Sequence, residues 1–286
     1  MVKENHDHFE FFYKITEGSV AINADCADRD NALVEKGLFF GFDNISGRDC
    51  FFENLTPNFR ESVFAPDSRC FNRFRQLIVP IASVNNTDPL TGLETLLRNH
   101  YKGKRILLLE DLSPFASIFR HYSRKYNIEL YTSEFFGPDH ASGSSVNGIL
   151  HIDMQKTHFP DNFFDLILHT DRFGFLADAA MAEREMVRIL KKGGHGIYTV
   201  HFEFLSDEDN RFAEMIDGNI NFLQEPIYCE DLLSPDGKWL VYRRFAFPDM
   251  KKRYDQIGAE FYGEYFHSTY LGILGDNGIA FVARKA

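Results

Sequence analysis

The sequence predicts an α/β protein with a doubly wound, mostly parallel sheet of seven strands and an irregular N-terminal extension. From residue 104 onwards, short apolar runs alternate with amphipathic helical segments, which favours parallel strands connected through helices. Two strands, at 259–267 and 279–284, follow the last helix, so we expect the final strand to be inserted antiparallel next to 259–267. Residues 1–85 are rich in aromatic residues and poor in long periodic segments. We therefore expect an aromatic-rich extension or cap over residues 1–85 and the α/β domain over 86–286.

Two helices are predicted around the junction between these parts. The first covers 68–79 and is expected to end at Pro80, because proline removes a helical hydrogen bond and clashes with the preceding turn. The second follows Asp88 and Pro89, a capping residue and a proline suited to the first helical position. Its apolar stripe consists of Leu93, Leu96, Leu97 and Tyr101.

The elements after residue 104 follow from apolar runs and helical periodicity. A helix over 178–191 is expected to end at the sequence KKGG, since cations and glycine are favoured at helix C-termini. The other expected elements are strands 106–110, 128–133, 149–152, 164–169 and 196–202, and helices 114–126 and 248–257.

Composition and charge exclude several function classes. The 286 residues carry a formal net charge of −11 (31 basic against 42 acidic residues), which does not favour a nucleic-acid partner. The four cysteines form no CxxC pair, and the N-terminal sequence has charges where a signal peptide needs an apolar run. No apolar stretch approaches a membrane span. We expect a cytoplasmic protein that acts on a small molecule, without a membrane or nucleic-acid partner, and the oligomeric state stays open.

Chemistry-bearing residues stand at the ends of four predicted strands. Ligands of open α/β sheets bind beyond the carboxyl ends of the strands, and the residues there are Glu110, Glu134, Asp153 and His169. An acid at the position of Glu134 suits a vicinal diol, because its two oxygens accept both hydroxyl protons. Asp153 suits an exocyclic amine such as that of adenine. Any one of these carboxylates is as readily explained as a turn or capping residue, but the ordered set favours a ligand site.

The turn after the first strand lacks the glycines that nucleotide-binding turns usually have. It reads Asp111, Leu112, Ser113, Pro114. Ser113 is a good N-cap residue and Pro114 suits the first helical position, so the positive end of the following helix is retained. The turn therefore predicts a site that is either reshaped or closed.

The segment from Asn147 to Phe202 resembles the second half of a class I methyltransferase that uses S-adenosylmethionine, of the type 11 kind. The resemblance is carried by Asp153, by the run FPDNFFD that ends at Asp165, and by LKKGG at 190–194. It covers roughly residues 104–286 and is most specific over 147–202.

A narrower resemblance is to methyltransferase-like proteins with a Cys-rich, zinc-ribbon-like N-terminal segment. The runs that carry it are NFRESVFAPDSRCFNRFRQ at 58–76, RILLLEDLSP at 105–114, SEFFG at 133–137 and PIYCEDLLSPDG at 226–237. In the last run, Cys229 stands where that group has a histidine. Of the zinc cysteines only Cys70 corresponds, so we expect no metal there.

The resemblance implies S-adenosylmethionine as the cofactor and assigns residues to it. Glu134 would bind the ribose, Asp153 the adenine amine, and Met154 would pack on the adenine ring. Helix amides near Ser113, together with its hydroxyl, would hold the carboxylate of the methionine part. Leu112 would leave the site open if it turned away and fill it if it turned inward. The expected cofactor-binding residues are Glu110, Leu112, Ser113, Phe115, Glu134, Phe135, Asp153, Met154 and His169.

Two histidines, His169 and His201, are candidates for a catalytic base, because both are expected at strand ends facing the cleft. A lone histidine is more often structural, and positioning alone supplies much of the acceleration of a methyl transfer. No Asn/Asp-Pro-Pro-aromatic run and no Pro-Cys nucleophile stand at the strand ends, which disfavours nucleic-acid methylation. The resemblance thus implies a methyltransferase for a small-molecule or glycan-type acceptor. The alternatives are an inactive methyltransferase-like binding or scaffold protein and, more weakly because no GxGxxG is present, a nicotinamide oxidoreductase.

Overall fold

The computed structural model describes residues 2–3, 7–230 and 237–286, and these form a ten-stranded sheet in the order β1-β2-β17-β18-β10-β9-β5-β6-β8-β7. Seven of the strands match the predicted set: β5 (Arg105–Leu108), β6 (Glu129–Glu134), β8 (Ile149–His151), β9 (Phe164–Thr170), β10 (Leu190–Thr199), β17 (Ala259–His267) and β18 (Ile279–Lys285). All seven are parallel except β18, which lies between β10 and β17 and is antiparallel to both. The predicted doubly wound sheet with an inserted antiparallel final strand is therefore confirmed.

Three further strands widen the sheet beyond the predicted seven. The N-terminal extension supplies β1 (Val2–Lys3) and β2 (Phe11–Ile15), and β2 pairs antiparallel with β17. At the other edge, β7 (Ser145–Val146) pairs antiparallel with β8. The rest of the extension forms α1 (Ala27–Lys36), the hairpin of β3 (Phe39–Asp43) and β4 (Arg48–Phe52), and the short helix η1 (Phe59–Glu61). The boundary at residue 85 stays a prediction.

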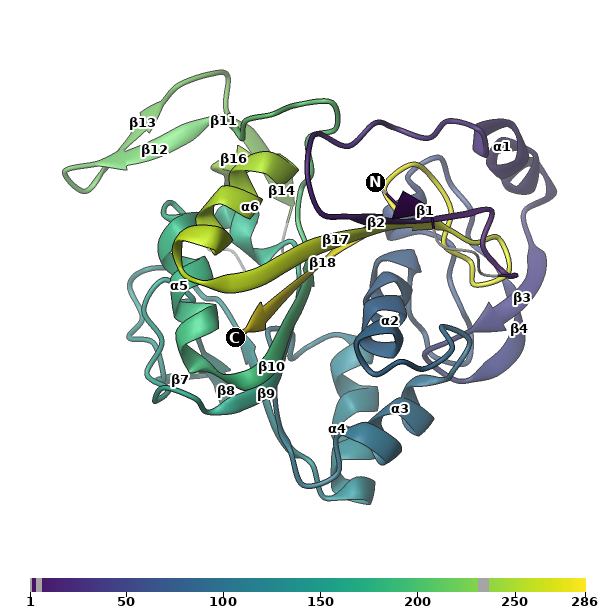
Figure 1. Ribbon diagram of the computed structural model, residues 1–286, viewed down its shortest axis with the longest axis horizontal. Coiled ribbons are helices and arrows are strands. Elements are labelled where there is room, and N and C mark those ends of the chain that lie inside the picture. The colour runs from purple at the N-terminus through teal and green to yellow at the C-terminus, as the bar shows by residue number, and fades with distance from the viewer. Residues whose placement is uncertain (1, 4–6, 231–236) are drawn as a thin grey trace.

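Helices cover both faces of the sheet (Figure 1). The helices α2 (Asn72–Val84), α3 (Leu93–His100) and α4 (Pro114–Tyr126) lie on one face, and α5 (Ala179–Ile189) and α6 (Phe247–Gln256) on the other. Successive side chains along β5 point alternately to the two helical layers. Ile106 and Leu108 pack with α2–α4, while Leu107 and Leu109 pack with the α5–α6 layer.

The predicted end of the first helix at Pro80 is wrong. Helix α2 continues through Pro80 to Val84. A proline removes one helical hydrogen bond, and here burial of the surrounding turns outweighs that loss, because Leu77, Ile81 and Ala82 are fully buried in the layer under the sheet. Helix α3 also begins later than expected: Asp88 accepts a hydrogen bond from the amide of Leu90 in a turn, and the helix starts at Leu93.

The sequence KKGG does not end a helix as predicted. Helix α5 ends at Ile189 and β10 begins at the next residue, so this run lies inside the strand. The pairing of β10 with β9 shifts register between Leu190 and His195, which marks a bulge. The glycines therefore lie in the bulged first part of β10. The strand ends at Thr199, before its predicted end at residue 202.

The segment between β10 and α6 forms small, separate two-stranded sheets above the carboxyl edge of the main sheet. The strands of this segment are β11 (Asn210–Arg211), β12 (Ala213–Ile216), β13 (Asn219–Phe222), β14 (Ile227–Glu230), β15 (Lys238–Val241) and β16 (Arg243–Arg244). A short helix, η2 (Arg172–Phe175), lies earlier in the chain, between β9 and α5. The β12–β13 hairpin projects from the body at the upper left of Figure 1. Within the described residues, none of the helices has the length and apolar character needed to cross a bilayer.

Two buried polar residues fix the N-terminal extension to the rest of the fold. Arg75 of α2 is fully buried and donates hydrogen bonds to the carbonyl oxygens of Cys70, Val63 and Gly272. His267 of β17, also fully buried, lies 3.1 Å from a carboxylate oxygen of Glu10 and 3.0 Å from those of Asp30. These contacts join chain segments that lie far apart in the sequence.

Candidate functional site

A small pocket opens at the carboxyl edge of the parallel strands, between the ends of β5, β6 and β8 and the inserted hairpins. Its walls are mostly apolar, and its charged members are one acid and one base. The lining residues are Leu109, Ser133, Glu134, Phe135, Ile152, Met154, Arg172, Phe175, Leu176 and Trp239. This is the position at which open α/β sheets bind ligands.

Glu134 is the acid of this pocket and the last residue of β6. One carboxylate oxygen accepts hydrogen bonds from the backbone amides of Asp111 (2.9 Å) and Leu112 (3.3 Å), so the residue holds the turn after β5 in place. The residue is only 3% exposed. Burial raises the pKa of Glu134, opposed by the positive charge of Arg172.

Arg172 is the base of the pocket, and sequence reasoning missed it. It follows β9 at the start of η2, and its guanidinium donates to the second carboxylate oxygen of Glu134 and to the carbonyl oxygen of Leu109 (3.1 Å). It also lies 3.8 Å from a carboxylate oxygen of Glu110. A signal was present: two acids at neighbouring strand ends are costly to bury without a cation, and Arg172 follows the strand that adjoins β5.

The turn after β5 leads into the capped N-terminus of α4, as predicted. Ser113 accepts a hydrogen bond from the amide of Ala116 (3.1 Å), as an N-cap residue does. The Ala116 amide is one of the helix amides that the resemblance assigned to the cofactor carboxylate, and here it donates to Ser113 instead. Phe115 is fully buried and packs against Phe74 and Phe119, with ring centroids 5.0 Å and 4.9 Å away, so its side chain belongs to the core.

The two remaining residues of this turn lie apart from the pocket. The carboxylate of Glu110 accepts a hydrogen bond from the hydroxyl of Thr170 (2.7 Å). Leu112 is 57% exposed and points to solvent. The side chain of Leu112 therefore does not close the site.

We expect the replacement Leu112→Gly to leave ligand affinity nearly unchanged. The exposed leucine fills no space in the pocket, and surface replacements of this kind are worth about 0.5 kcal/mol or less, or roughly a twofold change in affinity. Isothermal titration calorimetry with S-adenosylhomocysteine on parent and variant checks this. A sharp gain in affinity for the glycine variant would mean that Leu112 turns inward in solution.

Of the two residues assigned to adenine, Met154 lines the pocket and Asp153 does not, and the expected cofactor residue Phe135 also lines it. Met154 and Phe135 are on its wall, and the Phe135 ring lies 5.3 Å from that of Trp239. Asp153 turns away: its carboxylate accepts hydrogen bonds from the backbone amide (2.9 Å) and side-chain amide (3.2 Å) of Gln155. Asp153 instead lines a separate polar recess.

The structure separates the two candidate histidines. His169 is fully buried, with its ring stacked 4.7 Å from Tyr198 and close to Phe173, and neither ring nitrogen has a hydrogen-bond partner among the described residues. Burial lowers its pKa to about 3. The expectation that this ring faces the cleft is wrong, because the pleat of β9 turns it into the α5–α6 layer.

His201 lies two residues beyond the end of β10, beside the pocket. Its ring is 5.3 Å from that of Phe175, which lines the pocket, and its Nε2 lies 3.8 Å from the Cys229 sulfur. Its Nδ1 has no hydrogen-bond partner among the described residues. Burial lowers the pKa of His201, while the nearby Asp171 carboxylate partly offsets that effect. The ring is therefore neutral near pH 7 and able to accept a proton.

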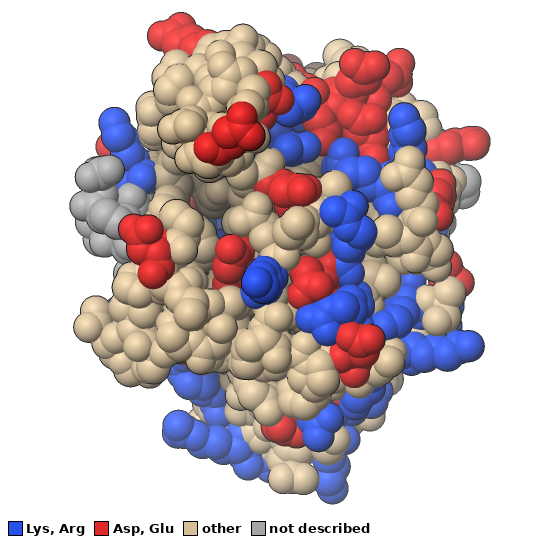
Figure 2. All heavy atoms as spheres, turned by 90° about the vertical axis from the view of Figure 1, so that its left-hand side faces the viewer, with Lys and Arg blue, Asp and Glu red and all other residues tan. Residues whose placement is uncertain are grey.

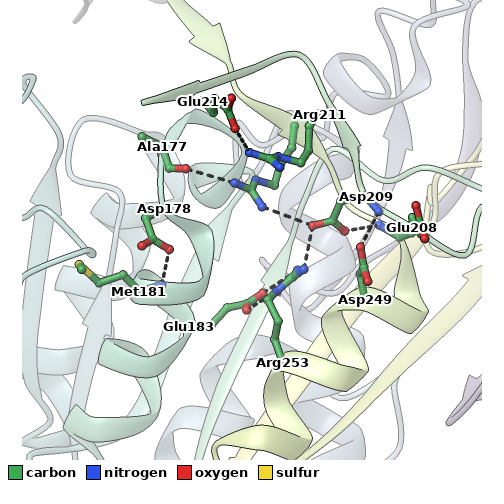
Figure 3. Close-up of polar contacts among 12 residues, drawn as sticks. Ala177, Asp178, Met181, Glu183, Glu208, Asp209, Arg211, Glu214, Asp249 and Arg253 are labelled. Atoms are coloured by element: carbon green, nitrogen blue, oxygen red, sulfur yellow. Dashed lines mark hydrogen bonds and ion pairs between the residues drawn. The ribbon is translucent and has the colours of Figure 1, made fainter. Parts of the chain in front are cut away.

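The polar recess lies on the side of α5 and the β12–β13 hairpin, where acidic and basic side chains intermingle (Figure 2). At its base, Arg253 donates to both carboxylate oxygens of the buried Glu183 (2.6 and 3.1 Å) and to Asp209 (2.8 Å), as Figure 3 shows. Arg243 lies 3.5 Å from Asp209. These charges pair with one another across α5, α6 and the inserted segment, so the network holds α6 in place.

The described residues contain no group of three or more His, Cys, Asp or Glu that could hold a metal. Among the cysteines, Cys26 and Cys70 are buried separately in the N-terminal part. Burial raises the pKa of the Cys70 thiol to about 12, because desolvation disfavours the charged thiolate.

Comparison with known proteins matches residues 119–198 to a family described as a methyltransferase domain. That segment holds β6, β8 and β9 and most of β10, and the sheet around it has the antiparallel final strand between its neighbours. The fold is the Rossmann-like methyltransferase fold. The match begins inside α4, beyond the turn at 110–113, and does not include the segment 58–76, so it lends no support to a zinc-ribbon-like N-terminus.

Solved structures of methyltransferases resemble the chain at low identity. An S-adenosylmethionine-dependent methyltransferase from Mesorhizobium loti is 15% identical, with 66% of this chain and 94% of that chain covered and a TM-score of 0.40. DesVI from Streptomyces venezuelae is 12% identical, with 75% and 94% covered and a TM-score of 0.41. A possible histamine N-methyltransferase from Thermotoga maritima is 14% identical, with 75% and 91% covered and a TM-score of 0.35. No curated protein matches the chain.

Proposed function

We propose that the chain is a methyltransferase that uses S-adenosylmethionine and acts on a small-molecule or glycan-type acceptor. The observation that carries this proposal is the pocket at the carboxyl edge, where a buried carboxylate, Glu134, stands among apolar walls. The fold, and the methyltransferase-domain match over 119–198, agree with it. The net charge of −11 favours a small acceptor over nucleic acid.

The chemistry of the residues that line the pocket suits the adenosine part of this cofactor. Ile152, Met154 and Phe135 form apolar walls suited to an aromatic base. Glu134 lines the pocket, where its carboxylate would accept the ribose hydroxyl protons. Glu110 lies just outside that lining, 3.8 Å from Arg172, and its negative charge would favour an ammonium group nearby. When bound, S-adenosylmethionine supplies a methyl group activated by a positively charged sulfur.

His201 is the proposed acceptor-side base. It stands beside the pocket at the end of β10 and is neutral near pH 7, so it can take the proton that a hydroxyl or amine acceptor loses as it is methylated. The polar groups near it include the Asp171 carboxylate, which is paired with Arg60, the Cys229 thiol, and the charges of Arg244 and Glu61. His169 is left out of this proposal because its ring is sealed in the core.

The test of the proposed function is ligand binding by calorimetry with S-adenosylmethionine and S-adenosylhomocysteine. Glu134→Ala should weaken binding by about 1.5–3 kcal/mol, roughly ten- to a hundredfold, because it removes charge-assisted hydrogen bonds to the ribose. Glu35→Ala removes the same charge from the exposed face of α1 and serves as the matched control. If the parent protein binds neither compound at millimolar concentration, or if Glu134→Ala binds as tightly as the parent, the assignment is wrong.

A further inference from the structure

We propose that Arg172 is an internal occupant of the nucleoside pocket and that a ligand binds by displacing its guanidinium from Glu134. This inference rests on the proposed function, since it concerns the same pocket. It makes Arg172 the residue that sets how tightly the pocket takes an adenosyl compound, in competition with the protein's own side chain.

The first observation is the place of Arg172. Its side chain lines the pocket itself, and it contacts the carboxylate that a ribose would use, the carbonyl oxygen of Leu109 and the surroundings of Glu110. A nucleoside cannot place its diol against the Arg172-facing oxygen of Glu134 while the guanidinium remains there. The two therefore compete for one acceptor.

The second observation is that Glu134 keeps hydrogen-bond donors when Arg172 leaves, although the carbonyl oxygen of Leu109 loses a donor and Glu110 loses a nearby cation. The other oxygen of Glu134 keeps its hydrogen bonds from the amides of Asp111 and Leu112. A diol supplies new donors to the oxygen that Arg172 releases, so the buried carboxylate is never left without partners.

The third observation is that Arg172 has a route out. It begins the short helix η2 at the edge of the sheet, and its side chain is 15% exposed while that of Glu134 is 2% exposed. The proposed displacement carries the guanidinium towards water by rotation about the side-chain bonds of Arg172. Leu112 already points to solvent, and Arg172 is the pocket-lining side chain that pairs with Glu134.

The experiment uses Trp239, the only tryptophan of the chain, which lies on the pocket wall and contacts Phe135. Its fluorescence is titrated with S-adenosylhomocysteine and, separately, with adenosine. The proteins are the parent, Arg172→Ala, Arg172→Lys and the control Arg184→Ala, which removes the same charge from the exposed face of α5. Cooperative thermal melting shows which variants are folded.

We expect Arg172→Ala to bind S-adenosylhomocysteine about ten- to a hundredfold more tightly than the parent, the gain that corresponds to one charge-assisted hydrogen bond no longer broken. Arg172→Lys should fall between the two, because an ammonium keeps the charge but lacks the planar fork of a guanidinium. Arg184→Ala should match the parent. If the alanine variant does not melt cooperatively, the inference is tested by the S-adenosylhomocysteine affinity of Arg172→Lys relative to the parent.

The outcomes separate this inference from the proposed function. If the parent binds and both Arg172 variants bind equally or more weakly, Arg172 belongs to the ligand's own binding site and the inference is overturned, while the proposed function stands. If the variants bind and the parent does not, the inference is supported and the parent's proposed activity is overturned. Absence of binding in every protein at millimolar ligand overturns both.

Discussion

His201→Gln should lower kcat by about 10²–10⁴-fold while leaving the affinity for S-adenosylhomocysteine unchanged. Glutamine keeps much of the size of histidine but cannot take up a proton, and positioned proton transfer contributes rate factors of this size. The ring lies beside Phe175 at the edge of the pocket, not among the residues that line it. Kinetics on a methyl-accepting substrate, together with calorimetry on the same preparations, check both halves of this expectation.

The pH dependence of the parent provides a second measurement on the same residue. Burial lowers the pKa of His201 from 6.5, so the ring is neutral, and active as a base, above that lowered pKa. We expect kcat/KM of the parent to fall with decreasing pH only below the usual pKa range of histidine. This decrease at acidic pH should be absent from the profile of His201→Gln. The control is His121→Gln, on the exposed face of α4. A variant that retains the full rate and the same decrease at acidic pH would remove His201 from the mechanism.

Arg75→Met should destabilise the protein by about 3 kcal/mol or more. The fully buried guanidinium donates to three backbone carbonyl oxygens and stacks 4.5 Å over the Phe52 ring. Methionine preserves the apolar stem but leaves the carbonyl oxygens of Cys70, Val63 and Gly272 without these donors. Each hydrogen bond from a charged group contributes about 1.5–3 kcal/mol, and such values are not additive.

Urea unfolding curves of the parent and of Arg75→Met measure this loss as a shift of the midpoint. Arg98→Met, an exposed arginine on α3, controls for the removal of charge alone. Similar midpoints for the two variants would show that Arg75 does not join the N-terminal segment to the loop at Gly272. A larger shift in Arg75→Met, with unchanged slope, would show that the two segments unfold together.

The sheet could be predicted from the sequence because its signals are local. Each strand is a short apolar run bounded by turn residues, and β17 and β18 stand side by side after the last helix. The boundaries failed where packing at long range decides the outcome. Pro80 is tolerated within α2 because the turns around it are buried under the sheet, which the local sequence does not reveal.

The candidate site was predictable in part for the same reason. Glu134 follows from its place at the end of a strand, and Met154 and Phe135 follow as neighbours of such ends. Arg172 was missed because its partner Glu134 lies 38 positions away, and Trp239 because it comes from an inserted hairpin. His169 was misplaced because the pleat of β9, not its distance from the strand end, decides which layer it enters.

The position of β18 constrains how the chain folds during synthesis. This strand lies in the middle of the sheet, between β10 and β17, yet it leaves the ribosome after both of them. Until it emerges, the nascent chain carries two unpaired strand edges and an apolar layer on α2 without its cover. A ribosome-bound chain stalled before residue 279 therefore exposes the surfaces that chaperones recognise, and closure of the fold waits until β18 has left the ribosome.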